Sequence, residues 1–208
     1  MIDAYTAATS NGLRAAIALA ESGLRHTIHK VDLSKGDQKT PKFLKMNPAG
    51  QIPVIVDNDT ADGPLTLTES TAILVYVAEK SGKLLPAGPA ARARVFEALA
   101  TAMTDVYAPF NALFHIQDDF PGKVPDDVIA DFDKRIRAAL TRVDGRLAKG
   151  DWIAGDFSIA DIALYCNVWR LKTALNRTFP DLANLQRWFV AIANRPGVQL
   201  GTSLAGRP

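Results

Sequence analysis

The sequence predicts an α/β domain followed by an all-helical domain, and three observations support this fold class. Strand-like and helical segments alternate in the first part of the chain, whereas later apolar residues recur only at helical spacing. Between the two parts, residues 82–91 contain two prolines and two glycines in ten positions. We therefore expect an α/β domain over residues 1–81, a linker over residues 82–91 and a helical domain over residues 92–208.

The first domain is expected to be a small mixed sheet with helices on its faces. Four segments have strand-like patterning between turn-rich borders: residues 2–6, 26–32, 53–57 and 65–68. Apolar residues spaced by three or four from Leu13 predict a helix that ends at Gly23, and Ser70 is placed to be the N-cap of a second helix. With a short helical turn over residues 41–46, the order is β-α-β-α-β-β-α, which predicts a mixed four-stranded sheet.

The peptide bond between Ile52 and Pro53 enters the third predicted strand. Proline cannot donate a strand hydrogen bond, so it is confined to the start or the edge of a strand. A trans bond that simply opens the strand is the commoner arrangement, because only about 5% of X-Pro bonds are cis. A cis bond would turn the backbone groups of Ile52 sideways, where an extended peptide could pair with them. The residues alone leave both arrangements open.

The second domain contains only helical periodicities. One long helix has its apolar face over residues 95–113, and it is expected to kink at Pro109. A second long helix has its apolar face over residues 129–147. Ser158, with an acid three residues later, has the spacing of a capping box and predicts the start of a buried helix. A last helix is expected to stop at the Arg-Pro-Gly sequence of residues 195–197, which completes a bundle.

Composition and charge exclude several classes of protein. The 208 residues are 48% hydrophobic and 22% charged with a net charge of +2, so we expect no binding to nucleic acid. No basic segment followed by an apolar run opens the chain, and no apolar span reaches 18 residues, so neither a secretion signal nor a membrane partner is expected. The single cysteine, Cys166, excludes an internal disulfide and a Cys-x-x-Cys pair, and a cytoplasmic location is expected. His26 and His29 would face opposite sides of a strand, so no metal site is expected.

The order and spacing of three motifs indicate a family. The motifs are Asn47-Pro48-x-Gly-x-Ile52-Pro53, Glu69-Ser70-x-Ala-Ile73 and Ser158-Ile-Ala-Asp161, and together they span nearly the whole chain. With the predicted order of elements, they resemble the cytosolic glutathione transferase superfamily, whose N-terminal domain is thioredoxin-like. The segment from Tyr5 to Gly12 and the loop ending in Gln38 are most similar to the bacterial nu class, which includes disulfide-bond reductases.

The resemblance implies a glutathione site in the first domain. It makes the Ile52-Pro53 bond cis, with the Ile52 backbone paired to the cysteinyl unit of glutathione. Glu69 and Ser70 would bind the γ-glutamyl end at a helix N-terminus, and Gln38 and Gln51 would reach glycyl and backbone groups. Each residue also has a purely structural interpretation: Ser70 as a helix cap, Glu69 as a first-turn acid, and both glutamines as solvated loop residues.

The implied chemistry uses a thiolate that glutathione supplies. A free thiol with a pKa of about 8.5 is only slightly ionised at neutral pH, and lowering that pKa by two units takes about 2.7 kcal/mol. A hydrogen bond to a charged group contributes about 1.5–3 kcal/mol, so one or two donors suffice. By resemblance to the nu class, Thr9 and Asn11 are expected to face the sulfur. Ser10 is the runner-up, because serine-type transferases place Ser four residues before a basic residue, here Arg14. The alternative is that Ser10 or Asn11 only caps the helix.

A second substrate, a small-molecule electrophile or disulfide, is expected to bind between the domains. The residues expected to line its pocket are Ala8, Tyr107, Asn111, Phe114, His115 and Trp169. Members of the superfamily are homodimers, and Met103 and Asp105 are candidate interface residues. The sequence departs from nu-class relatives at Asp131, where they can offer an arginine to glutathione. Because of this departure, the resemblance is weaker support for reductase activity in this chain than for its other implications.

The expected function is that of a glutathione-dependent transferase with disulfide-bond reductase activity, with reduced or oxidised glutathione as its co-substrate. The glutathione thiolate would attack an electrophile or the sulfur of a mixed disulfide. The alternative is a non-catalytic glutathione-binding or regulatory protein of the same fold.

Overall fold

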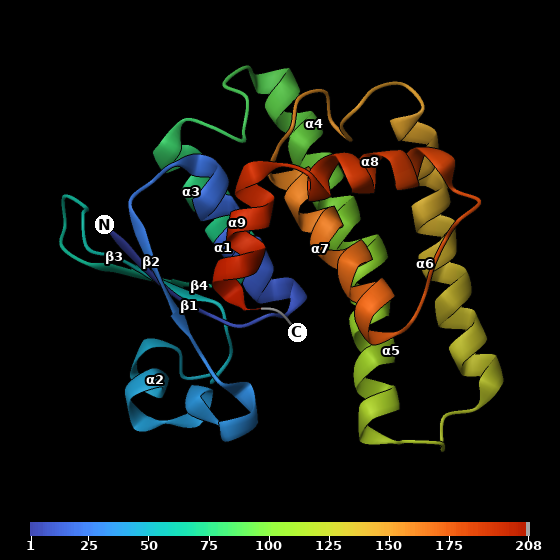
Figure 1. Ribbon diagram of the computed structural model, residues 1–208, viewed down its shortest axis with the longest axis horizontal. Coiled ribbons are helices and arrows are strands. Elements are labelled where there is room, and N and C mark those ends of the chain that lie inside the picture. Colours follow the sequence, from blue (N-terminus) through green and yellow to red (C-terminus); the bar gives the residue numbers. More distant parts are fainter. Residues whose placement is uncertain (207–208) are drawn as a thin grey trace. The chain divides into compact units, whose positions relative to one another are not determined.

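A computed structural model describes residues 1–206, and Figure 1 shows it as a ribbon. The chain forms two units. One consists of Met1–Leu85 together with the C-terminal segment from Ala193, and the other of Pro86–Ile192. The first unit has the predicted α/β fold with one C-terminal helix added, and the second contains helices.

The sheet of the first unit is mixed and four-stranded, as predicted. Its strands are β1 (Ile2–Thr6), β2 (His26–Lys30), β3 (Val54–Asp57) and β4 (Leu65–Thr68), in the order β2-β1-β3-β4. β1 runs parallel to β2 and antiparallel to β3, and β3 and β4 form the expected hairpin. In β1, Ile2, Ala4 and Thr6 are buried while Asp3 and Tyr5 are partly exposed, which is the alternation of a strand with two different faces.

The helices of the first unit cover both faces of this sheet. They are α1 (Ser10–Ser22), α2 (Pro41–Met46), α3 (Ser70–Ser81) and α9 (Pro196–Ala205), with short 3-10 turns at Leu33–Lys35 and Asp37–Lys39. α2 covers the face to which Tyr5 and Val54 point, because Phe43 packs with Val54 and Val31 in one apolar cluster. α1 packs against β1, α3 and α9, so nearly all of its side chains are buried.

The C-terminal helix α9 corrects the predicted domain boundary. The sequence placed residues 92–208 in one helical domain. The helix predicted to stop at residues 195–197 does end just before them, at Ala193, but Pro196 then begins a further helix, α9, as proline often does at a first helical position. At Gly201 the backbone of α9 lies directly against the backbone of α1. A Cβ at this position would be only 2.6 Å from the Cα of Ile17, so a side chain has no room there. Arg195 also donates to both carboxylate oxygens of Glu21, at 3.0 and 2.7 Å. Residues 195–205 therefore belong with the sheet domain.

The second unit is built of long helices. They are α4 (Pro89–Ala100), α5 (Ala108–Asp119), α6 (Asp126–Leu147), α7 (Ile159–Ala174) and α8 (Ala183–Ala193). Where the sequence predicts a kink, a π-helical segment, Thr101–Tyr107, joins α4 to α5 shortly before Pro109. The side-chain amide of Asn167 in α7 donates to the carbonyl of Ala102 in this segment at 2.8 Å, and so satisfies backbone that an α-helix would have paired internally.

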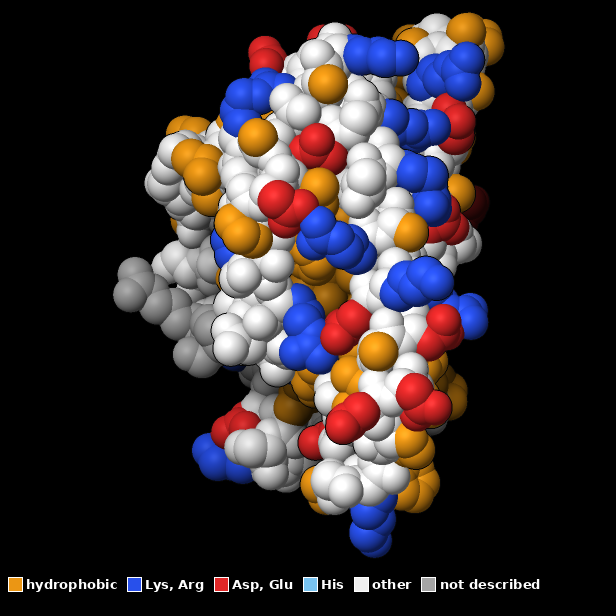
Figure 2. Space-filling model, turned by 90° about the vertical axis from the view of Figure 1, so that its right-hand side faces the viewer, with side chains coloured by type: hydrophobic (Ala, Val, Ile, Leu, Met, Phe, Trp, Pro, Cys, Tyr) orange, Lys and Arg blue, Asp and Glu red, His pale blue; other side chains and the backbone are white. Residues whose placement is uncertain are grey.

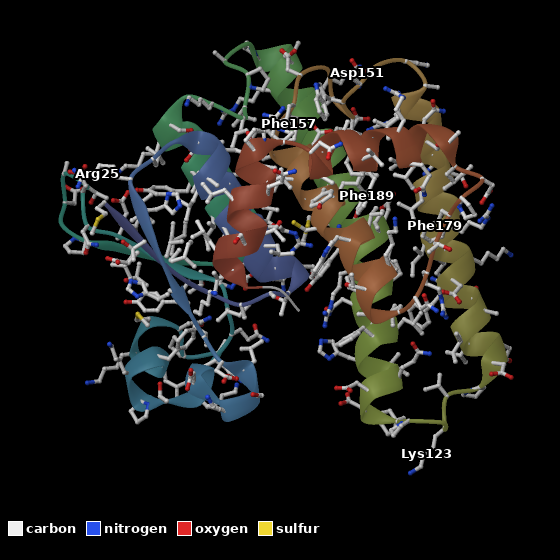
Figure 3. All side chains as sticks on the ribbon, in the orientation of Figure 1. Arg25, Lys123, Asp151, Phe157, Phe179 and Phe189 are labelled. Carbon is white, nitrogen blue, oxygen red and sulfur yellow. The ribbon has the colours of Figure 1, made fainter. Side chains whose placement is uncertain are left out.

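The predicted capping box begins α7, which is buried along most of its length. Asp161 accepts from the Ser158 backbone N–H at 3.0 Å, and its other oxygen accepts from Trp188 Nε1 at 2.9 Å and from the Ile153 backbone at 3.0 Å. At the same helix, Tyr165 stacks on Phe189 of α8 with ring centroids 4.9 Å apart (Figure 3). These contacts fix α7 at the centre of the helical unit.

The surface of the molecule carries mixed charge. Figure 2 shows a face on which basic and acidic side chains are interspersed. Ion pairs of the helical unit include Arg142 in α6 with Asp105 at 2.8 Å and Arg177 with Asp133 at 2.9 Å. Across the described residues, no helix has the length and hydrophobicity that crossing a membrane requires.

Gly12 sets the position of α1 on the sheet and supplies a first prediction. A Cβ on Gly12 would overlap the carbonyl oxygen of Ala7 and Oγ1 of Thr6. Gly12→Ala is therefore expected to lower the free energy of unfolding by about 1–3 kcal/mol, the usual effect of an overpacked core. Urea denaturation measures the loss.

The matched control for this prediction is Gly145→Ala in α6, where an added methyl would meet no atom within 4 Å. That substitution should stabilise the protein by about 0.5–1 kcal/mol, because alanine is the better helix former. Equal stability of Gly12→Ala and the wild type would contradict the close approach of α1 to the β1–α1 loop.

Asp57 ties the end of β3 to α3. Its carboxylate is fully buried and accepts from the Tyr76 hydroxyl at 2.6 Å and from the Lys80 ammonium. Burial by itself raises the pKa of Asp57, but the hydrogen bonds from Lys80 and Tyr76 outweigh it and hold the pKa below its ordinary value. Since the pKa is lower in the folded state than in the unfolded one, the ionised carboxylate stabilises the fold above the unfolded-state pKa. This contribution is lost as the pH falls through the folded-state value.

We expect Asp57→Asn to be less stable than the wild type at pH 7 by about 1.5–3 kcal/mol, because a charged hydrogen-bond acceptor is lost. The difference should shrink as the pH falls below the unfolded-state pKa of about 4 toward the lower folded-state pKa, because the carboxylate is protonated first in the unfolded state. Melting temperatures measured for both proteins between pH 7 and pH 2.5 check this. If the two melting temperatures differed by the same amount at every pH, ionisation of Asp57 would not contribute to the stability of the fold.

Candidate functional site

The junction between β1 and α1 holds the residues expected to contact a sulfur atom. Thr9 is the N-cap of α1, and its hydroxyl oxygen accepts from the Gly12 backbone N–H at 3.1 Å. The interpretation that Ser10 or Asn11 caps this helix is therefore wrong, because Ser10 is already its first helical residue. As an acceptor in the cap, the Thr9 hydroxyl keeps its own hydrogen for donation to another group.

Asn11 lies in the first turn of α1 and is partly exposed. Its side-chain oxygen accepts a hydrogen bond from Nη1 of Arg14, one turn further along the helix. A guanidinium carries only donors, so the amide atom that faces it is the oxygen and the NH2 group points elsewhere. The donor end of the Asn11 amide is thereby fixed in direction.

Arg14 is the residue that sequence reasoning missed, since it served there only as a spacing marker for Ser10. The side chain is fully buried, and Nη1 also donates to Ser70 Oγ at 3.0 Å. The start of α1 is thus joined to the start of α3. The available signal was a single charge, Arg14, within the apolar run of residues 13–20.

The N-terminus of α3 has no side-chain cap. Ser70 is the first residue of α3 and not its N-cap as predicted; the N-cap is Glu69, whose side chain makes no capping hydrogen bond. The first N–H groups of a helix lack intrahelical partners and carry partial positive charge. A carboxylate placed here would meet those N–H groups together with the buried Ser70 hydroxyl.

Glu69 has an unusual backbone conformation, with φ 67° and ψ 109°. For a residue with a Cβ, such a conformation costs about 1–3 kcal/mol and is concentrated at functional sites. The side chain is exposed. Its carboxylate is therefore available to a ligand beside Ser70.

The turn before β3 presents the backbone of Ile52. The Ile52-Pro53 bond is cis, and Ile52 packs on the apolar cluster beneath α2. Asn47 shapes the turn: its amide donates to the Gln51 carbonyl at 2.7 Å and accepts from the Ala49 N–H at 3.1 Å. The residues expected to hold an extended peptide are thus on a turn that a buried asparagine fixes.

Gln38 and Gln51 come from neighbouring loops. The Lys39 ammonium donates to the Ala49 carbonyl at 3.3 Å, and a Cβ on Gly50 would lie 3.0 Å from the Gln38 carbonyl. Gln51 is exposed, and the buried side-chain oxygen of Gln38 has no hydrogen-bond partner among the described residues. A buried acceptor in this position suits a ligand that brings its own N–H.

The residues expected at a second-substrate pocket fall in different units. Ala8 precedes α1 in the first unit, and the others lie in the helical unit. Along the π segment and α5, Tyr107 packs edge-on against Phe110 at 5.8 Å, and Phe114 packs against His115 at 5.5 Å. Asn111 lies on the same helix, and Trp169 is partly buried on α7.

The remaining candidates have structural partners. His29 Nε2 lies 2.8 Å from Asp3, and His26 Nδ1 lies 2.7 Å from the Leu24 carbonyl. Within residues 1–206, no three His, Cys, Asp or Glu side chains gather as a metal site would require. Asp131 pairs with Arg135 in α6 at 2.7 Å, and Cys166 is buried in α7.

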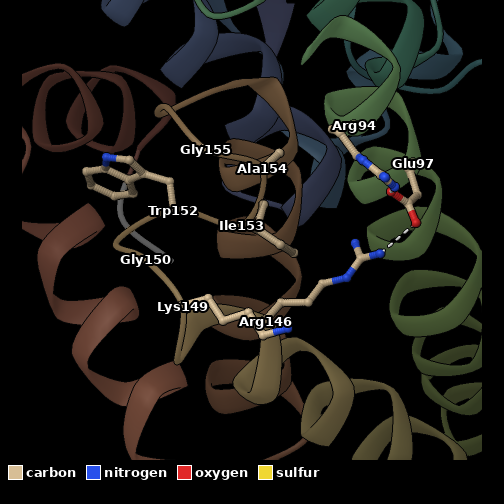
Figure 4. Close-up of a pocket in the computed structure, with 9 residues that line it drawn as sticks. All are labelled: Arg94, Glu97, Arg146, Lys149, Gly150, Trp152, Ile153, Ala154 and Gly155. Carbon is tan, nitrogen blue, oxygen red and sulfur yellow. Dashed lines mark hydrogen bonds and ion pairs between the residues drawn. The ribbon is translucent and has the colours of Figure 1, made fainter. Parts of the chain in front are cut away.

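A hollow of about 430 Å³ lies in the helical unit. Its lining residues are shown in Figure 4: Arg94, Glu97, Arg146, Lys149, Gly150 and residues 152–155. Glu97 accepts from Arg94 at 2.9 Å and from Arg146 at 2.7 Å. Hydrogen bonding from Arg94, with the charge of Arg146, lowers the pKa of Glu97. None of the predicted site residues lines this hollow, and Glu97 already pairs with both of its arginines.

Two family profiles match the chain. Residues 10–80 match the glutathione S-transferase N-terminal domain, and residues 126–191 match the glutathione S-transferase C-terminal domain. The chain is also 34% identical over 201 residues to the disulfide-bond oxidoreductase YfcG of Escherichia coli (strain K12). That alignment covers 94% of this chain and 92% of YfcG.

Solved structures agree with this assignment. A glutathione transferase from Pseudomonas putida, with one glutathione disulfide bound per subunit, superposes with a TM-score of 0.90 at 33% identity, covering 99% of this chain and 92% of that one. A glutathione transferase from Burkholderia graminis, with two glutathione molecules bound per subunit, has a TM-score of 0.87 at 32% identity, covering 100% and 89%. The chain belongs to the glutathione S-transferase family.

Proposed function

We propose that this protein binds glutathione and uses its thiolate to reduce disulfide bonds, as a member of the nu class. The observation that carries the proposal is the meeting of two helix N-termini through one buried arginine. Arg14 donates to Asn11 in α1 and to Ser70 in α3, and Thr9 is the N-cap of α1, so each of these three residues keeps a donor that a ligand could use. The similarity to YfcG and to proteins that bound glutathione or its disulfide supports the same assignment.

The tripeptide fits the groups of the first unit by charge and by hydrogen bonding. The α-carboxylate of its γ-glutamyl end would lie at the N-terminus of α3, with Ser70 as a donor, and its ammonium would lie beside the exposed Glu69. The cysteinyl backbone would pair with the backbone of Ile52, the residue directly before Pro53 and β3. Gln38 and Gln51 would contact the glycyl end.

Ionisation of the thiol is the step that the α1 junction would assist. The Thr9 hydroxyl and the Asn11 NH2 group are neutral donors beside a helix N-terminus, and each would bond better to a thiolate than to a thiol. Two such bonds, at about 1.5–3 kcal/mol each, are enough to lower the thiol pKa to near neutrality. Ser10, buried at the first position of α1, remains the runner-up donor.

The proposed reaction uses two molecules of glutathione for each substrate disulfide that is reduced. The first thiolate attacks one sulfur of the substrate disulfide, forms a mixed disulfide and displaces the other sulfur as a thiolate, which takes up a proton. A second glutathione thiolate attacks the glutathione sulfur of that mixed disulfide and releases the second thiol. Two glutathiones are thereby oxidised to glutathione disulfide while the substrate disulfide gains two electrons and two protons. A cytoplasmic location, where glutathione is kept reduced, is part of this proposal.

Binding and turnover experiments test the proposal together. We expect calorimetry to detect binding of both reduced and oxidised glutathione, and we expect reduction of a small disulfide when glutathione is supplied and its disulfide is recycled. Failure to bind either form at millimolar concentration would overturn the assignment. Turnover of only a chloronitrobenzene would replace reduction by conjugation, and binding without any turnover would select the non-catalytic alternative.

We also propose that the protein is a homodimer. A groove of about 580 Å³ runs along the helical unit, lined by Asp105, Ala108, Pro109, Ala112, Phe132 and other residues of the π segment, α5 and α6. It combines an apolar floor with the charges of Arg135 and Arg142, as a self-complementary interface requires. Met103, expected at the interface, is in the same π segment.

We expect light scattering to give the mass of two chains for the wild type, and Ala108→Glu to shift it toward one chain. The added carboxylate would have to be desolvated in an interface of about 800 Å² per partner. Ala191→Glu, on an exposed position of α8, is the control and should leave the mass unchanged. A monomeric wild type would contradict the homodimer without affecting the glutathione site.

A further inference from the structure

Arg14 is a buried cation whose contacts lead to the predicted site. Its relative exposure is 0%, and it lies in the second turn of α1. A buried charge is costly unless it is hydrogen-bonded or paired. Two hydrogen bonds from its Nη1 go to Asn11 and Ser70, which are separated by 59 positions in the sequence. One nitrogen therefore contacts both a residue expected at the sulfur and a residue expected at the γ-glutamyl carboxylate.

The contact with Asn11 decides which end of the amide faces away from Arg14. If the amide were turned over, its NH2 group would face the guanidinium N–H, and donor would meet donor. With the oxygen held toward Arg14, the NH2 group is directed to the other side of the side chain. A thiolate needs a donor and is repelled by an amide oxygen, so the orientation of Asn11 determines whether it helps or hinders ionisation.

The contact with Ser70 works in the same way. Ser70 Oγ accepts from Arg14 at 3.0 Å, which uses one lone pair and leaves the hydroxyl hydrogen to be donated in another direction. At the first position of α3, the N–H groups of the helix point toward the same anion. The hydroxyl is thereby turned from a possible acceptor into a donor for a carboxylate.

We propose that Arg14 is a positioning residue that orients the Asn11 amide and the Ser70 hydroxyl as donors, acting on the thiol through Asn11 and on the γ-glutamyl carboxylate through Ser70. This inference rests on the proposed function. It differs from a purely structural tie between α1 and α3, which would affect stability and leave the ionisation of a bound thiol unchanged. It also differs from a direct effect of the arginine charge on the sulfur, which would add to the effect of Asn11.

The test measures the pKa of the thiol of bound glutathione from its ultraviolet thiolate absorbance. We expect Arg14→Met to raise this pKa by about one unit, the size of one lost hydrogen bond to a charged group, and Asn11→Ala to raise it equally. The double variant should show no larger shift than Asn11→Ala alone, because Arg14 acts through Asn11. Arg14→Lys keeps a cation with three donors and should recover part of the shift.

The binding of glutathione gives a second readout. Arg14→Met and Ser70→Ala should each weaken binding about tenfold, which corresponds to about 1.4 kcal/mol at 25 °C. Arg195→Met is the matched control, because it removes an arginine that pairs with Glu21 at the other end of α1. It is expected to lower the melting temperature and leave the thiol pKa and the glutathione affinity unchanged.

Three results would overturn the inference while the proposed function stands. One is an unchanged thiol pKa in Arg14→Met when Asn11→Ala raises it. Another is a double variant whose shift equals the sum of the two single shifts. If Arg14→Met does not fold, Asn11→Asp decides: it keeps an oxygen toward Arg14 and replaces the NH2 donor, so an unchanged thiol pKa would show that Asn11 is not oriented as a donor. A wild type that binds no glutathione would instead refute the proposed function itself.

Discussion

The buried guanidinium of Arg14 is the constraint on which the rest of the site depends. Removing a charge from water costs several kcal/mol even after the protein relaxes, so its surroundings must supply hydrogen bonds. Here those surroundings include Asn11 and Ser70 at the starts of α1 and α3. Helix N-termini carry partial positive charge, so the cation increases a potential that is already positive. The fold therefore concentrates positive potential where an anion would be stabilised, and the proposal places two anionic groups of glutathione there, the γ-glutamyl carboxylate and the thiolate.

Such a concentration of charge requires that the helices cannot move apart. α1 is held on one side by the approach of Gly12 to the β1–α1 loop, and on another by α9, whose Gly201 lies against the backbone of Ile17. α3 is tied to β3 by the buried carboxylate of Asp57 and its bonds to Tyr76 and Lys80. Groups placed on rigid elements keep their geometry better than groups on loops. The contacts that stabilise the first unit are therefore also the ones that preorganise its donors.

The elements that the sequence predicted well are those with local signals. The β3–β4 hairpin, the capping box at Ser158 and the irregularity before Pro109 each depend on neighbouring residues, and each is present. The cis bond at Ile52-Pro53 is also present, but the residues alone left it open and the resemblance to the glutathione transferases implied it. What local patterns could not predict depends on distant contacts. Arg14 meets Ser70 from 56 positions away, and α9 joins the sheet domain because Gly201 fits against α1. The choice of Thr9 as the N-cap depended on which of three neighbouring polar residues adopted extended backbone, a competition that composition does not decide.

Glu69 shows how the demands of folding and binding separate at this site. Its backbone occupies a conformation that costs a non-glycine residue about 1–3 kcal/mol, and glycine would occupy it more easily. Its side chain is exposed and gives α3 no capping hydrogen bond, so the carboxylate does not offset the backbone strain by stabilising the helix. The same backbone turn, however, brings Ser70 to the first position of α3, within reach of Arg14, and leaves the carboxylate beside it. A ligand with an ammonium and a carboxylate on one carbon would use both residues at once, which accounts for an acid at a position where stability alone favours glycine.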